Sequence, residues 1–203
     1  MWGVIKNIWH HFDGRMTLMT ILGVLLLVAV YPLMHYAPAE WFVEDGAVEN
    51  VQLFILCLAA IAALSAKYER KLFILVAFVV LFLIIREVNG GRAFFCKLYL
   101  EPDQVCRWKN MKYGYLADWI RWGIGLGVII FAVAAKLWQP IWKYIRKAPV
   151  FVWDFIVFGL AMIGAQAAES VYIDNEIMEE SMETIMYLML GWLIWRYGRT
   201  EIK

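Results

Sequence analysis

The stretch that decides the fold runs from Ala168 to Tyr187, AESVYIDNEIMEESMETIMY, and carries six acidic residues between two apolar runs. After it, only Thr184 to Trp195 is free of charge before Arg196, a run of 12 residues. A membrane-spanning helix needs about 20 residues, so a helix through this run must begin near Glu176 and carry glutamates into the membrane. At about 100° per residue, four of them fall on one helical face. They are Glu176, Glu179, Glu180 and Glu183. An acidic stripe cannot face lipid, so we expect it to face the helix bundle or a wet cavity.

The composition is that of a membrane protein. The chain is 63% hydrophobic and 18% charged, whereas a soluble domain is closer to half apolar. Its eleven Trp and ten Tyr suit the aromatic belts of a bilayer interface. We therefore predict an all-α, polytopic membrane protein with one membrane domain over residues 1–203. The net charge of +1 gives no reason to expect nucleic acid as a partner, and the expected partner is the lipid bilayer.

Apolar runs between charged turns predict six transmembrane helices. Their approximate ranges are 16–36, 48–66, 72–93, 116–137, 150–168 and 176–197. The third begins with an uncharged run of only 14 residues, Leu72 to Ile85, which places Arg86 and Glu87 below the membrane surface. In the fourth, Gly123 and Gly127 have a spacing that permits close helix contact. Apolar residues on a helical period predict a short amphipathic helix over residues 1–15.

The distribution of charge predicts the topology. Six spans put both termini on one side, together with 12 of the 19 basic residues, while 14 of the 18 acids lie on the other side. By the positive-inside rule both termini are cytoplasmic, in a bacterial inner membrane or a plasma membrane. Cys96 and Cys106 then lie in an outer loop, where a disulfide between them can persist.

Polar groups from four spans converge on the outer half of the predicted bundle, and His35 lies at the same level. Carboxylates with one imidazole match the preferences of Ca²⁺, Mn²⁺ or non-haem iron, and match structural Zn²⁺ less well. The candidate ligands of a divalent ion are Glu49, Glu87, Glu176, Glu179, Glu180, Glu183 and His35. The same carboxylates could instead hold protons. Beside a bound metal, Glu87 or Glu169 could serve as a general base.

The same residues also have a purely structural interpretation. Glu49 and Glu176 can be first-turn residues favoured by the helix dipole, and His35 can be an interfacial histidine. The deeper acids can pair with counter-ions inside the protein. The candidate counter-ions are Arg86, Arg92 and Arg121.

Three functions are compatible with this pattern. The leading one is a cation- or proton-binding site in the outer-leaflet half, in a transporter or sensor component. The second is a metal-dependent membrane enzyme acting on a lipid or lipid-linked substrate at the outer leaflet. The third is a structural or partner subunit, or a homo-oligomer, whose buried ion pairs set helix register. The cytoplasmic half has few polar groups beyond Asp154 and Ser65, which counts against a full transport path.

Overall fold

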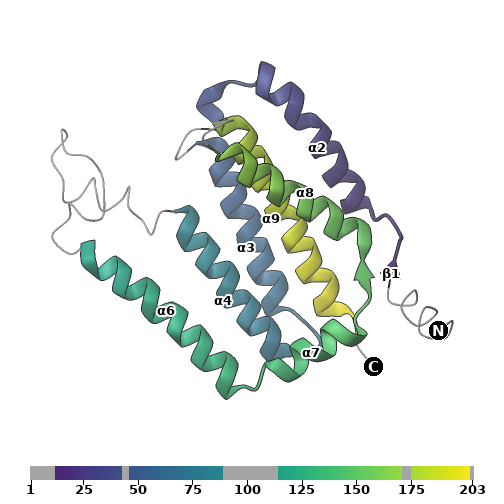
Figure 1. The fold of residues 1–203 in the computed structure, drawn as a ribbon, viewed down its shortest axis with the longest axis vertical. Coiled ribbons are helices and arrows are strands. Elements are labelled where there is room, and N and C mark those ends of the chain that lie inside the picture. Colours follow the sequence, from purple (N-terminus) through teal and green to yellow (C-terminus); the bar gives the residue numbers. More distant parts are fainter. Residues whose placement is uncertain (1–11, 43–45, 89–113, 171–174, 202–203) are drawn as a thin grey trace.

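The computed structural model of the protein describes residues 12–42, 46–88, 114–170 and 175–201. Within these ranges the regular secondary structure is helical apart from one pair of two-residue parallel strands (Figure 1). The all-α prediction is therefore confirmed. The elements are β1 Phe12–Asp13, α2 Leu18–Tyr36, η1 Ala39–Trp41, α3 Ala47–Leu64, α4 Arg70–Glu87, α6 Gly114–Ala134, α7 Trp138–Lys147, β2 Val150–Phe151, α8 Val152–Ala168 and α9 Glu176–Arg199.

Each of the six predicted spans overlaps one long helix, but only some of these helices have the character of a membrane span. By length and hydropathy, α2 and α3 can cross a membrane. A third candidate is the pair formed by Trp122–Ala134 and α7, which meet at a bend of 76°. The apolar helix α8 has only 17 residues. Among the described residues there are thus two or three candidate spans, and six spans with cytoplasmic termini stay a prediction.

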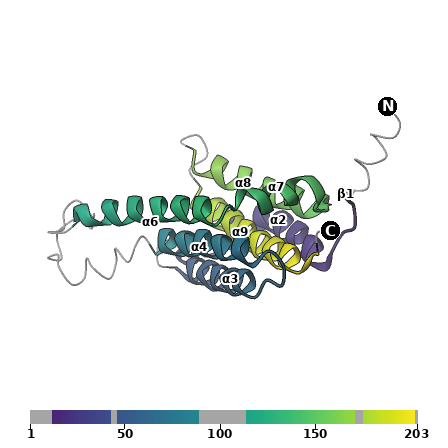
Figure 2. The ribbon, with the colours of Figure 1, turned by 90° about the horizontal axis from the view of Figure 1, so that it is seen from below.

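Helix α9 is the element around which the bundle is built. It packs against α8, α3 and α2, and Figures 1 and 2 show it between them. Tyr187 and Ile194 of α9 join a core with α3 and α4. On the opposite face, Ile185 and Met189 join a second core with α2 and α8. The helix that carries the acidic stripe is therefore enclosed on two faces by apolar packing.

Local signals set the start of α9 and its distance from α3. The Asn175 side chain caps the first turn by accepting a hydrogen bond from the Met178 N–H at 2.8 Å. Near the other end, a Cβ on Gly198 would lie 3.1 Å from the Cβ of Ala66. The Lys67 N–H also donates to the Gly198 carbonyl at 2.8 Å. Gly198 therefore permits a close contact that fixes α9 against the end of α3.

The beginning of the chain departs from the prediction of an amphipathic helix over residues 1–15. Phe12 and Asp13 form β1, which pairs in parallel with Val150 and Phe151 of β2. Residues 1–11 lie outside the described ranges. The strand forms here because of a tertiary contact, since its partner strand is supplied by a segment more than 130 positions away.

Helix α7 occupies a segment that was predicted to be a charged turn. Its apolar residues Trp138, Trp142 and Ile145 share one exposed face, while Lys147 lies on the opposite side. The Arg146 guanidinium borders the apolar face and lies 4.6 Å from the Trp142 ring centroid. This segregation is typical of a helix lying at a membrane interface. Its three basic residues favoured a turn in the prediction, and its helical period extends over only ten residues.

Candidate carboxylate site

The site begins with Gln52, which the first turns of α3 aim at α9. The Gln52 side chain is fully buried, and its Nε2 donates to the Glu180 carboxylate Oε2 at 2.8 Å. The same nitrogen lies 3.0 Å from the Glu180 carbonyl and 3.2 Å from the Thr184 hydroxyl. A buried amide must satisfy its donors within the protein, so these contacts hold Glu180 in one orientation.

A second part of the site comes from the last turn of α4. Arg86 Nη2 donates to Glu183 Oε1 at 2.8 Å, and Arg86 Nε lies 3.8 Å from Glu87 Oε1. Glu87 also accepts a hydrogen bond from the Tyr187 hydroxyl at 2.6 Å. The carboxylate side chains of Glu87 and Glu183 are 8% and 12% exposed, whereas the Arg86 side chain is 56% exposed. Arg86 therefore bridges the acids from the solvent-facing side of the group.

Together these residues form the α9 carboxylate cluster, which we define as Gln52, Arg86, Glu87, Glu180, Glu183 and Tyr187. Glu180 and Glu183 are three positions apart on α9, and Tyr187 follows Glu183 by four, so all three share one helical face. Their partners come from α3 and α4, which pack against each other and against α9. The cluster is thus assembled by three helices.

Other predicted acids lie at the edge of this cluster or apart from it. Glu176 is exposed in the first turn of α9. Glu49 and Glu179 are half-buried and both have interactions of their own. Glu169, proposed as a base, is exposed after α8 and accepts a hydrogen bond from Gln166 Nε2 at 3.0 Å.

His35 interacts within its own helix. Its Nδ1 lies 3.0 Å from the Tyr31 carbonyl oxygen, and its ring contacts the rings of Tyr31 and Tyr36. Within the described residues, no three or more His, Cys, Asp or Glu side chains form a group that could hold a metal ion. The divalent-ion site stays a prediction.

Several residues of the predicted disulfide and counter-ions lie outside the residues that the structure describes. Arg92, Cys96 and Cys106 lie in residues 89–113, and the side chain of Arg121 is also undescribed. The disulfide and these two counter-ions therefore stay predictions.

A second buried polar group was not anticipated as a site. Asp154, in the first turn of α8, is 1% exposed. Its Oδ2 accepts hydrogen bonds from Arg196 Nη1 at 2.6 Å and from Trp192 Nε1 at 3.2 Å, and its Oδ1 accepts from the Thr20 hydroxyl. The sequence signal was a single acid in an otherwise apolar run, which predicts a buried partner.

Arg196 extends this group to the beginning of the chain. Its Nη2 lies 3.4 Å from Asp13 Oδ2 in β1, and its guanidinium lies 3.4 Å from the ring centroid of Phe151 in β2. Cation–π and ionic contacts with both strands are favourable in such a partly dehydrated place. The Asp154–Arg196 pair thus ties α8, α9 and the two strands together.

The α9 carboxylate cluster has more negative than positive groups. Three carboxylates and one guanidinium give two excess negative charges when all are ionised, since 3 − 1 = 2. Such a group can take up protons or bind a small cation. No family model, curated protein or solved structure matches this chain.

Proposed function

We propose that this chain is a small multi-pass membrane protein whose α9 carboxylate cluster binds protons or a small cation, as a component of a sensor or transporter. The observation that carries the proposal is the surroundings of Glu180. Its half-buried carboxylate accepts a hydrogen bond from the neutral amide of Gln52. A neutral amide orients a carboxylate without balancing its charge, so a proton or a cation stabilises such a site.

The neighbouring acids add to this effect. Glu87 and Glu183 are both within 4 Å of the same Arg86 guanidinium, so one positive charge serves two carboxylates. The remaining negative charge acts on Glu180 from the next helical turn. Uptake of a proton or cation at Glu180 therefore lowers the repulsion in the whole cluster.

The arrangement at the far end of α9 favours a sensor over a transporter. Asp154 is among the few polar residues that a path through that half could use. It is already held by Arg196 and Trp192. A carboxylate that is paired and fully buried is a poor transient binding site for an ion that moves through the protein.

A structural role is the second candidate function. Glu183 and Glu87 have close partners in Arg86 and Tyr187, and these contacts join α4 to α9. Buried pairs of this kind can set the rotation of one helix against another without binding any ligand. The two candidates differ in whether Glu180 exchanges protons or cations with the solvent.

Infrared spectroscopy of the protein in lipid vesicles tests this difference. Between about pH 4 and pH 9, the carbonyl band of a protonated carboxyl group reports proton uptake by acids. We expect one component of this band in the wild-type protein to be missing in Glu180→Gln. Glu176→Gln is the matched control, because Glu176 is exposed on the same helix, and it should keep that component.

Cation binding is measured in parallel by titration calorimetry with Na⁺, Ca²⁺ and Mn²⁺. Binding heat in the wild-type protein and in Glu176→Gln, but not in Glu180→Gln, would identify a cation as the ligand. If wild type and Glu180→Gln give the same infrared titration and the same heats, the proposal is wrong and the structural role is favoured.

A further inference from the structure

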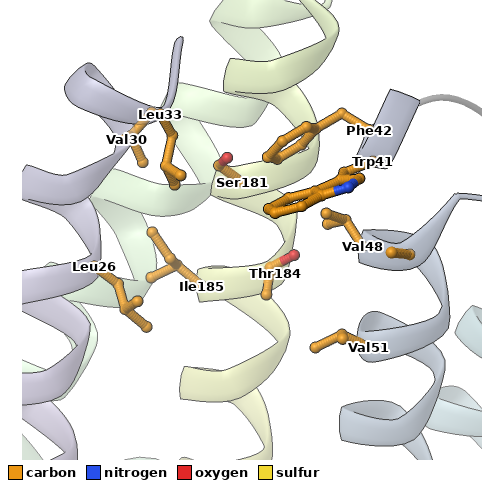
Figure 3. Close-up of a pocket in the computed structure, with 11 residues that line it drawn as sticks. Leu26, Val30, Leu33, Trp41, Phe42, Val48, Val51, Ser181, Thr184 and Ile185 are labelled. Carbon is orange, nitrogen blue, oxygen red and sulfur yellow. The ribbon is translucent and has the colours of Figure 1, made fainter. Parts of the chain in front are cut away.

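A cavity of about 300 Å³ lies between α2, η1, α3 and α9 (Figure 3). Leu26 and Leu33 of α2 form one wall, and Val48 and Val51 of α3 form the opposite wall. Ile185 of α9 lies between them. The walls are therefore hydrocarbon, and a ligand that fills the cavity must be largely apolar.

Two aromatic residues close one end of this cavity. Figure 3 shows Trp41 and Phe42 projecting from the segment between α2 and α3 across the front of α9. Phe42 is buried, whereas Trp41 is about half exposed. Trp and Phe at the end of a predicted span suit the level where lipid head groups meet hydrocarbon.

The cavity also contains a hydroxyl group without a partner. Ser181 of α9 is 6% exposed, and its Oγ has no hydrogen-bond partner among the described residues. The neighbouring Thr184 hydroxyl is already used, since it donates to the Glu180 carbonyl at 2.8 Å. A buried hydroxyl is unfavourable unless something accepts from it or donates to it. The lining thus combines apolar walls with one buried hydroxyl group that no described residue pairs.

The depth of Ser181 agrees with a particular kind of ligand. Ser181 follows Glu176 by five residues, so it lies about 7.5 Å along the helix from the start of α9. A head-group layer is about 5–7 Å thick on each side of the hydrocarbon core. If α9 starts within this layer, Ser181 lies where lipid ester groups give way to acyl chains.

A second cavity lies between the same three helices. It has a volume of about 280 Å³ and is bordered by Met19 of α2, Leu58 of α3, and Leu188 and Trp195 of α9. This second cavity lies closer to the C-terminal end of α9 than the cavity at Ser181 does. The two cavities together follow the direction in which an acyl chain descends from the membrane surface.

We propose that the cavity at Ser181 binds an acyl chain of a diacyl glycerophospholipid, with an ester carbonyl of the lipid accepting a hydrogen bond from Ser181 Oγ. The chain lies between α2 and α3, and Trp41 and Phe42 cover its upper part. This proposal depends on insertion into a membrane. It does not depend on proton or cation binding by the α9 carboxylate cluster.

Photo-crosslinking in vesicles tests occupancy. The vesicles consist of phosphatidylcholine with a small fraction of phosphatidylcholine that carries a diazirine on one acyl chain, and mass spectrometry maps the labelled residues. We expect the peptide around Ile185 to be labelled several-fold more than that around Val79, which is exposed on α4 and borders neither cavity described above. Val51→Phe, which fills the cavity, should remove this excess. Val28→Phe is the matched control, because Val28 is 69% exposed and does not border the cavity.

The hydrogen bond is tested with a second lipid. A diether phosphatidylcholine with the same diazirine lacks the ester carbonyl, so it should label the wild-type cavity several-fold less than the diester lipid. Ser181→Ala should label equally with both lipids. Equal labelling of wild type by the two lipids would overturn the role of Ser181.

The occupancy proposal fails if Val51→Phe and wild type are labelled alike around Ile185, or if Ile185 shows no excess over Val79. Glu180→Gln separates this result from the proposed function. That variant is expected to lose the proton or cation site and to keep wild-type lipid labelling. Loss of lipid labelling in Glu180→Gln would contradict the independence of the two sites.

Discussion

Replacing Arg196 by methionine removes the cation that contacts the buried Asp154 carboxylate at 2.6 Å while keeping an apolar side chain of similar length. The Asp154 side chain is 1% exposed and that of Arg196 is 16% exposed, so solvent screens this pair weakly. Removing one partner of such a pair costs about 3–5 kcal/mol. The cation–π contact with Phe151, at 3.4 Å, is lost as well. Thr20 and Trp192 still donate to Asp154, so we expect a value near 3 kcal/mol.

The measurement is thermal unfolding of the purified protein in detergent micelles, followed by circular dichroism. For a chain of this size, 1 kcal/mol corresponds to about 2–4 °C, so a loss near 3 kcal/mol lowers the Tm by about 6–12 °C. Arg199→Met is the matched control. Arg199 is exposed and its guanidinium lies 4.7 Å from the Trp195 ring centroid, so this change should cost less than about 1 kcal/mol.

A double variant tests the reasoning behind the magnitude. In Asp154→Asn/Arg196→Met no charge is left buried without a partner, so most of the loss in Arg196→Met should be recovered. A Tm change below about 2 °C in Arg196→Met would show that the pair contributes little. A double variant as unstable as the sum of both single variants would show that the cost does not come from an unpaired charge.

Two further predictions concern packing and membrane position. Gly23→Ala places a Cβ 2.8 Å from Cγ1 of Val157, so either α2 or the Val157 side chain must shift, and the free energy of unfolding should fall by about 1–3 kcal/mol. Gly125→Ala, whose Cβ meets no atom of the described residues within 4 Å, should be neutral or stabilising in the same assay, and equal destabilisation of both would refute the packing argument. On α7, a thiol at Lys147→Cys should react several-fold faster with a water-soluble maleimide in vesicles than one at Ile145→Cys. Both positions are exposed on the protein, so equal rates would contradict an interfacial α7.

The positions of the long helices could be predicted because each is an apolar run between polar turns. The range 16–36 and the observed helix Leu18–Tyr36 differ by two residues at one end. Prediction was poorer where a segment depends on distant contacts. Residues 12–13 become a strand because β2 lies beside them, and no local pattern contains that information. Gly123 and Gly127 have the spacing of a close helix contact, yet no atom of the described residues packs within 4 Å of a Cβ at either position.

The sequence by itself determined that α9 carries glutamates into the bundle, because 12 uncharged residues are too few to cross a membrane. It also determined which acids share a face, since that follows from the helical period. Only the tertiary structure decided their partners. Glu180 meets Gln52 across 128 positions, and Glu183 meets Arg86 across 97. These pairs depend on how far the helices slide and turn against one another, which is set by packing between residues far apart in the chain.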